Sequence, residues 1–324
     1  MPSFRRSLGI ALGLALAGAG TRAQAQVAPQ GFAVNRFYPS APGGGWFVMD
    51  DLDLHGSLGG ALALTVGYAH DPLRVTGGAN SVAVVSNEAV TDVGGALTYD
   101  RWRLYFNVTS PFLITGQSGT VGDYSFTGPS LNLGSNPDAV SDVRLGADLR
   151  IVGAPRSRFR LGAGAQLFIP FGNRADYDTD GTLRGTVRTL CAGDVRSFTW
   201  ACQLGVHLRP LDDSPTPGSP RGSEMLFGVG AGAKIPVGMS GQWVAVVGPE
   251  IYGATAFRSF LGSNGTALES LLSGRIEGTR DDQMQVRVKL GVGVGLVRKL
   301  GAAEWRVVVG VEMFNHNQRD RSAL

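Results

Sequence analysis

The sequence predicts an all-β fold, an antiparallel up-and-down β-barrel of about 12 strands (range about 10–14). Three observations predict it. The stretch MQVRVKLGVGVGLVRKL (residues 284–300) alternates apolar residues with polar residues or glycine, well beyond the roughly 5–6 residues of an average strand. Similar stretches recur along the chain, and the connections between them alternate between short and long.

Residues 1–25 have the physical parts of a secretory signal peptide. Arg5 and Arg6 form a basic start, residues 8–20 are apolar, and residues 23–25 (AQA) supply a small-x-small cleavage site. We therefore expect this stretch to be removed during secretion. The arginine pair lacks the surroundings of a twin-arginine signal, which favours ordinary secretion.

The rest of the chain divides into three parts. We expect residues 26–57 to form an N-terminal segment, residues 58–314 the barrel and residues 315–324 a C-terminal tail. Two arrangements are open for the N-terminal segment: it folds into the lumen as a plug, or it adds a strand to the wall.

The first expected strands differ in how regularly they alternate. LGGALALTVGYAHDPLRV (58–75) is clear, and VAVVSNEAVTDVGGALTY (82–99) is less regular. RWRLYFNVTSPFLI (101–114) places aromatic and aliphatic residues on one face and Arg, Tyr, Asn and Thr on the other. DVRLGADLRIV (142–152) and RFRLGAGAQLFIPF (158–171) set Val, Leu, Ile or Ala against charged residues and glycine. Successive side chains of a strand point to opposite faces, so each stretch has one apolar face.

The second half of the chain continues the pattern. The segment at 267–278 is the weakest of the seven, and no segment shows a convincing helical period. We expect these strands at residues 182–195, 197–209, 224–237, 242–257, 267–278, 284–300 and 304–314.

The connections fall into two classes. Those after the even-numbered strands are short, whereas residues 115–141, 172–183, 210–223 and 258–266 form longer loops. Outer-membrane barrels have short periplasmic turns and longer outer loops, and a soluble sandwich has no reason to segregate them. An even number of strands is expected to return both termini to the periplasmic side.

A membrane barrel also explains the long apolar faces. In hydrocarbon every backbone N–H and C=O must be paired within the protein, and a closed barrel achieves this with lipid outside and a lumen inside. Trp102, Trp200, Trp243 and Trp305 lie near strand ends, where amphipathic rings favour the membrane interface. The alternative is a soluble sandwich of two apolar-packed sheets.

Charges on the presumed lumen phase are of both signs, and they include the ten candidates for lumen-facing residues. Such charges form either the selectivity rings of a channel or salt-bridge ladders that fill a narrow barrel. The candidates are Asp142, Arg144, Asp148, Arg150, Arg158, Arg160, Lys234, Glu250, Arg287 and Lys289.

Glycines share the lumen phase in two strands. Glycine permits close approach of other chain segments. The stretch GVGAGA is not a phosphate-binding motif, because no helix follows it. The glycines are Gly228, Gly230, Gly232, Gly291, Gly293 and Gly295.

Cys191 and Cys202 are the only cysteines and are equidistant from a turn at Arg196-Ser197. They are therefore expected to lie directly opposite each other on one face, within reach of a disulfide. An oxidising envelope permits the bond. The alternative is two small apolar residues facing lipid.

Three aspartates are a weak calcium candidate. Asp176, Asp178 and Asp180 in DYDTDG match the first half of a calcium loop, but position twelve is Val187 instead of Glu. A solvated acidic loop is the other interpretation. We expect no cofactor, since the four histidines show no metal-ligand spacing.

At FAVNRFYPSAPGGGWFVMDDLDLHG, DVRLGADLRI, LGAGAQLFIPFGNRADYDTDGTLR, GSEMLFGVGAGAKI and VVGPEIYG the sequence resembles the N-terminal barrel region of myxobacterial-type OmpA-family outer-membrane proteins. The resemblance covers most of residues 31–314. It implies a barrel-only member, because the chain stops ten residues past Phe314 without the peptidoglycan-binding domain of many family members. Peptidoglycan is therefore not an expected partner.

These observations predict an outer-membrane channel or transporter for small solutes. The expected partners are outer-membrane lipid, the barrel assembly machinery and a small solute. Without its signal peptide the chain is close to neutral, which argues against nucleic acid. A closed structural or surface-interaction barrel is the second hypothesis, and an outer-membrane enzyme is the third. We expect no enzyme, because no nucleophile motif is present.

Overall fold

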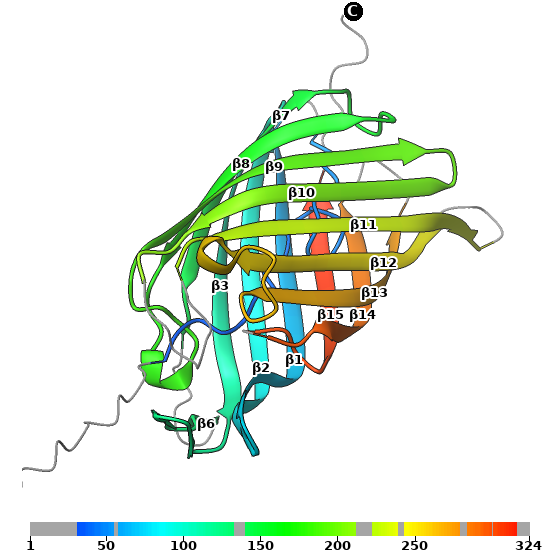
Figure 1. Ribbon diagram of the computed structural model, residues 1–324. Coiled ribbons are helices and arrows are strands. Elements are labelled where there is room, and N and C mark those ends of the chain that lie inside the picture. The colour runs from blue at the N-terminus through cyan, green and yellow to red at the C-terminus, as the bar shows by residue number, and fades with distance from the viewer. Residues whose placement is uncertain are drawn as a thin grey trace, which may run out of the picture.

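Twelve antiparallel strands close into one barrel (Figure 1). Each strand pairs with the next strand of the wall, and β1 pairs with β15 to complete the ring. The wall consists of β1 (Gly59–Gly77), β2 (Asn80–Tyr99), β3 (Trp102–Thr115), β7 (Val143–Val152), β8 (Arg160–Ile169), β9 (Arg184–Val195), β10 (Phe198–Leu208), β11 (Glu224–Val237), β12 (Trp243–Ala256), β13 (Thr266–Gly278), β14 (Gln285–Val297) and β15 (Trp305–Asn315). The predicted fold class and strand number are confirmed.

The computed structural model describes residues 31–54, 58–132, 140–211, 222–238, 243–278, 284–299 and 301–315. Apart from strands, these residues form two short 3-10 turns, η1 (Arg174–Asp176) and η2 (Phe257–Ser259). No helix in this part of the chain is long and apolar enough to cross a membrane.

The wall has two different ends. The connections from β3 to β7, β8 to β9, β10 to β11 and β12 to β13 share one end, which we call the long-loop end. The tight β2–β3 and β9–β10 turns, the start of β1 and the end of β15 share the other, the short-turn end, whereas the tight β1–β2 turn lies at the long-loop end. The predicted segregation of long and short connections is therefore present.

Three short strands lie in the connection from β3 to β7 and were not predicted. They are β4 (Gly119–Val121), β5 (Tyr124–Phe126) and β6 (Ser130–Asn132), and β6 pairs with the end of β3. Val121 and Phe126 pack with residues of β1 and β2 in one buried apolar cluster. This cover explains why β1 and β2 extend further than the sequence predicted, to Gly77 and Asn80.

The outer and inner faces of the wall follow the predicted phases. In β14, Val288 is 50% exposed whereas its neighbour Lys289 is 3% exposed. The same apolar exposure recurs on other strands, for example at Leu62, Leu104 and Leu204. The barrel therefore presents apolar side chains outward and buries its charged side chains inside.

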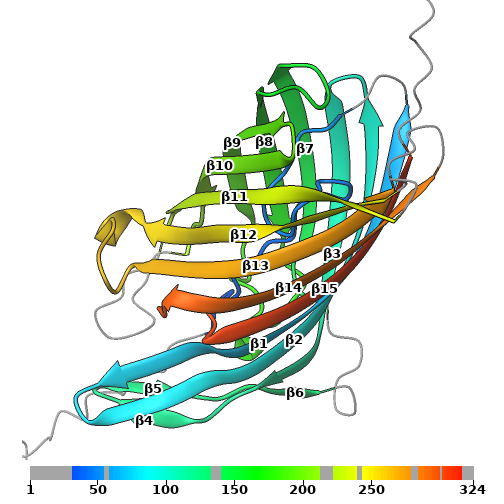
Figure 2. The same cartoon turned by 90° about the vertical axis from the view of Figure 1, so that its right-hand side faces the viewer.

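Residues 31–54, which we call the inner segment, lie inside this ring (Figure 2). None of them is exposed. At the long-loop end, the backbone N–H of Val34 donates to the carbonyl of Tyr177 over 3.0 Å. At the short-turn end, Asp53 accepts a hydrogen bond from the backbone N–H of Arg156 over 3.1 Å. The inner segment thus runs through the barrel from one end to the other.

This path corrects one expectation. The start of β1 and the end of β15 do share one end, as an even number of strands requires. Gly31, however, lies beside Arg174 at the long-loop end. The chain before β1 crosses the lumen. Because this stretch is not a strand of the wall, the even number of strands does not predict on which side it begins.

Candidate functional site

Lumen glycines make room for the inner segment. A Cβ added at Gly228 would collide with Met49, and one at Gly232 would lie 2.9 Å from the ring of Trp46. On the facing wall, a Cβ at Gly291 would lie 3.0 Å from the ring of Phe47. These glycines lie on the lumen phase, as predicted, and here they leave space for the large side chains of the inner segment.

Glu250 of β12 holds the middle of the inner segment. Its carboxylate accepts backbone hydrogen bonds from Phe47 (3.0 Å), Val48 (2.8 Å) and Met49 (3.3 Å). Glu250 is fully buried. Because buried N–H groups and a buried carboxylate are costly without partners, this contact satisfies both sides at once. We call it the Glu250 clamp.

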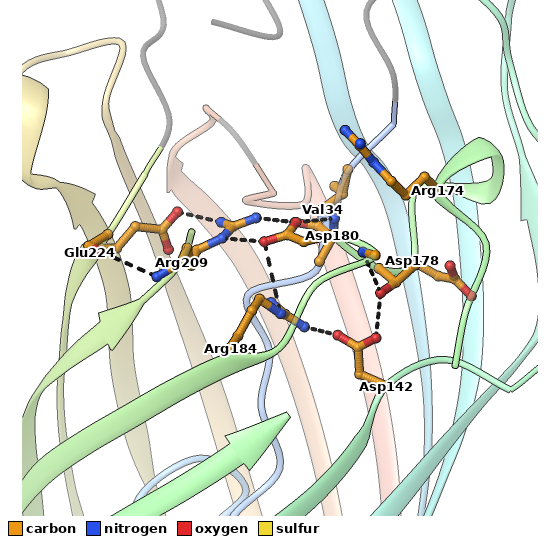
Figure 3. Close-up of polar contacts among 12 residues, drawn as sticks. Val34, Asp142, Arg174, Asp178, Asp180, Arg184, Arg209 and Glu224 are labelled. Carbon is orange, nitrogen blue, oxygen red and sulfur yellow. Dashed lines mark hydrogen bonds and ion pairs between the residues drawn. The ribbon is translucent and has the colours of Figure 1, made fainter. Parts of the chain in front are cut away.

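A charge network lies at the long-loop end, and we call it the mouth network (Figure 3). Arg209 donates to Asp180 and to Glu224, over 2.6 Å in each case. Arg36 of the inner segment also donates to Glu224, over 2.9 Å. The backbone N–H of Ala33 donates to Asp180 over 2.9 Å. The start of the inner segment is therefore bound to charges from the β8–β9 connection and from β11.

The network reaches the wall through Arg184 and Asp142, which form an ion pair (Figure 3). Arg184 also lies 3.9 Å from Asp180. Burial raises the pKa of Asp180, but the guanidinium groups of Arg209 and Arg184 outweigh it and hold that pKa well below its usual range. Asp180 is therefore ionised at neutral pH.

The short-turn half of the lumen has its own ion pairs. Arg103 of β3 bridges Asp50 of the inner segment and Asp148 of β7, the latter over 2.6 Å. Lys289 of β14 donates to Glu312 over 2.7 Å and to the carbonyl of Trp46 over 3.1 Å. Polar groups of the wall thus contact the inner segment along much of its length.

Cavities remain beside the inner segment. One of about 190 Å³ lies at the short-turn end, lined by charges that include Asp51, Lys234 and Arg275. A smaller one at the long-loop end is lined by Phe37, Tyr38 and several charged residues of the wall. The lumen is therefore occupied but not completely filled.

Most predicted lumen residues do lie inside. Lys234 is half-buried, with 28% of its side chain exposed. Asp142, Arg144, Asp148, Arg150, Arg160, Glu250, Arg287 and Lys289 are all buried. The prediction is wrong for Arg158, which is exposed and precedes β8, because the strand begins only at Arg160.

Sequence reasoning missed part of the network. Arg188, Arg306 and Glu312 are buried wall charges on the polar phase of their strands, so alternation was a usable signal for them. Arg36 and Asp50 belong to the inner segment, where no strand pattern marks the buried side.

Cys191 and Cys202 are paired across β9 and β10 and form a disulfide, with their Cα atoms 5.1 Å apart. They lie on the same phase as Val187 and Leu204, which are outward-facing. The bond therefore joins two strands on the outer face and does not line the lumen.

The three aspartates of DYDTDG do not form a calcium site in this arrangement. Asp180 turns to Arg209, which removes it from any shared ligand set with Asp176 and Asp178. Within the described ranges, no group of three or more His, Cys, Asp or Glu side chains is placed to hold a metal ion. The partner of Asp180 is therefore an arginine, Arg209, and not a calcium ion as the motif suggested.

No protein-family model matches the sequence, and no curated protein matches it. The resemblance to the OmpA family therefore stays a prediction. Among solved structures, an outer membrane channel from Pseudomonas putida F1 is 15% identical with a TM-score of 0.48, over 80% of this chain and 96% of that chain. The NanC porin is 8% identical with a TM-score of 0.45, over 77% and 98%. The beta domain of the Bordetella autotransporter BrkA is 11% identical with a TM-score of 0.40, over 78% and 98%.

Proposed function

We propose that this protein is an outer-membrane channel for small solutes whose lumen is closed by its own inner segment. One observation carries the proposal: a charged, twelve-strand lumen is occupied by a separate stretch of chain and not by the side chains of the wall alone. A blockage of this kind can be relieved without breaking a single strand pairing.

The outer-membrane location rests on physical grounds. The exposed apolar side chains follow the outer phase of the strands, where a barrel contacts lipid. Trp102, Trp243 and Trp305 occupy the first positions of β3, β12 and β15 and are exposed, as expected of residues at a membrane interface. The predicted signal peptide supplies the route to the envelope.

A closed structural barrel is the second candidate. The observation that favours it is the close fit of the inner segment. Glu250 binds its backbone, and lumen glycines leave just enough space for its large side chains. In that case the lumen has no conducting state. The two candidates differ in whether removal of the inner segment, or weakening of its contacts, produces a pore.

Single-channel conductance in a planar lipid bilayer tests the proposal. We expect the full chain to be mostly closed, and a variant without residues 26–57 to show reproducible current steps. Insertion of that variant without conductance would favour the closed barrel. A chain that stays soluble without detergent would contradict a membrane barrel altogether.

Glu250→Gln provides a milder change. The substitution removes the negative charge that three backbone N–H groups share, and hydrogen bonds to charged groups contribute about 1.5–3 kcal/mol each. We expect more frequent openings and a free energy of unfolding lower by about 1–3 kcal/mol. Glu304→Gln is the matched control, since the Glu304 side chain is 44% exposed and outside the clamp. Equal behaviour of the two variants would contradict a role for the clamp.

A further inference from the structure

Arg144 is a buried cation without a carboxylate partner in the described part of the chain. It lies in β7 and is 4% exposed. Among the residues that the structure describes, Arg144 makes no ion pair, and its buried Nη2 has no hydrogen-bond partner. Most other lumen arginines, such as Arg103 and Arg287, pair with carboxylates. An uncompensated buried charge is unfavourable, so Arg144 requires an explanation.

Two carboxylates that share a cavity with Arg144 are already engaged. Asp142 pairs with Arg184 and accepts a hydrogen bond from Thr179 over 2.5 Å. Asp92 accepts from Asn107 over 2.6 Å and from Thr109 over 2.8 Å. The charge of Asp142 is balanced by Arg184, and both oxygens of Asp92 accept from neutral groups, so neither carboxylate forms an ion pair with Arg144.

The other two carboxylates of that cavity are unsuitable partners. Burial raises the pKa of Asp178 to about 8, which leaves this carboxyl neutral at pH 7. Glu88 pairs with Ile114 of β3 and Arg144 with Asn107 of the same strand. Seven residues of extended chain correspond to about 23 Å, too far for an ion pair.

On its other side, Arg144 lines a second cavity, which we call the basic cavity. It lies between the inner segment and the wall, has a volume of about 30 Å³, and is lined by Arg36, Arg144 and Arg188 without any described Asp or Glu. Arg36 pairs with Glu224, and Arg188 donates to Asp148 over 3.0 Å. The charge of Arg144 is therefore the one that stays unbalanced there.

Further donors point to a ligand in the basic cavity. The hydroxyl of Thr186 is buried without a partner, and so is the Nε–H of Arg188, which lies two residues further on the same face of β9. Three donor groups on β7 and β9 thus line a space whose described acceptors are only the neutral oxygens of side chains such as Gln166 and Gln203, without a carboxylate. The volume of about 30 Å³ exceeds the roughly 10–15 Å³ that one water needs.

We propose that the basic cavity binds a small monovalent inorganic anion of the chloride class. The guanidinium of Arg144, the hydroxyl of Thr186 and the Nε–H of Arg188 are its donors. Arg36, Tyr38 and Val48 of the inner segment line the same space, so the anion lies between the inner segment and the wall. By balancing the nearby guanidinium groups, it stabilises the inner segment in the lumen.

Urea unfolding of the refolded full chain in detergent micelles tests this site. Sodium chloride replaces sodium gluconate at constant ionic strength. Because a ligand that binds only the folded state stabilises it in proportion to the logarithm of its concentration above Kd, the unfolding midpoint should increase with chloride. The increase should vanish in Arg144→Gln and persist in Arg158→Gln, where the same substitution is made at an exposed residue.

An equal chloride effect in all three proteins would be a general salt effect and would overturn the proposal. If Arg144→Gln does not fold, the wild-type chain crystallised with bromide decides the question. An anomalous peak between Arg144 and Thr186 supports the site, and the absence of a peak at saturating bromide overturns it. Neither experiment requires conduction, so a closed barrel would leave the anion site standing.

Discussion

Single residues decide how closely the inner segment packs against the wall. A Cβ added at Gly228 would lie 2.3 Å from the terminal methyl of Met49, which must then shift, whereas one at Gly274 would make an ordinary contact of 3.8 Å with Val247. The same glycine-to-alanine change therefore has different consequences on the two faces of the barrel.

Gly228→Ala is expected to lower the free energy of unfolding by about 1 kcal/mol, the low end of the effect of overpacking, because the flexible end of Met49 can move aside. Gly274→Ala is the control and should change it by well under 1 kcal/mol. Urea midpoints measure both. Met49→Ala should reduce the effect of Gly228→Ala in the double variant, because it removes the colliding side chain. An unchanged effect would mean that the two residues do not meet.

Asp178 makes stability depend on pH. Its folded-state pKa of about 8 lies above the ordinary value of 3.8, through burial first and then the charges of Asp176 and Asp142. The folded state therefore binds the proton more tightly than the unfolded state. The free energy of unfolding should fall as pH rises from about 4 to about 8 and then level off.

Asp178→Asn should remove this part of the pH dependence, because an amide does not ionise. Relative to the wild type, the variant should gain stability between pH 5 and pH 9, measured as urea midpoints. Asp123→Asn, at an exposed residue of the β4–β5 turn, serves as the control and should follow the wild type. Parallel profiles for all three proteins would contradict the raised pKa.

At the scale of elements, the strands follow from alternation. β14 places Leu290 outward, 57% exposed, and buries Lys289 beside it. The lumen phase tolerates the charge of Lys289 because Glu312 pairs with it. At Leu290, on the outer phase, the structure describes no such partner.

Leu290→Arg places a charge on the outer face at the middle of β14. If that face contacts lipid, refolding into bilayers should be destabilised by about 2–4 kcal/mol. Leu290→Phe keeps the face apolar and should be nearly neutral. Folding yields in lipid vesicles compare the two. Equal yields would mean that this face of the barrel does not meet hydrocarbon.

At the scale of the whole molecule, the inner segment and the wall form one closed arrangement. The chain enters at the long-loop end, crosses the lumen, and starts the wall at the short-turn end. Contacts with Glu224, Glu250, Asp180 and Arg103 join it to distant parts of the wall. The barrel therefore closes around its own N-terminal part.

This threading predicts which ends share a side of the membrane. An epitope tag inserted before Gly31 should be accessible from the same side as a tag at Gly262 in the β12–β13 connection. A tag in the turn between β9 and β10, at Arg196, should be accessible only from the other side. Antibody binding to intact and permeabilised cells distinguishes the sides. A Gly31 tag that behaves like the Arg196 tag would contradict the threading.

The sequence by itself determined the wall, because a strand half exposed to one medium and half to another must alternate at every second residue. The segments at 182–195 and 224–237 matched β9 and β11 to within two residues, and the cross-strand position of Cys191 and Cys202 followed from the turn between them. The prediction that Arg158 faces the lumen was wrong for a related reason. Alternation gives the face of a residue within a strand but does not mark where the strand begins.

Only the tertiary structure decided what occupies the lumen. The inner segment has a single isolated bridge, between Gly45 and Asp50, and no period of its own. Its partners are as far away in sequence as Glu250, about 200 residues from Val48. The closed ring decides which side chains meet, and so which cations find a carboxylate. Arg144 finds none among the residues that the structure describes. Local patterns describe the surfaces of a barrel, but the contacts across its interior exist only once it is closed.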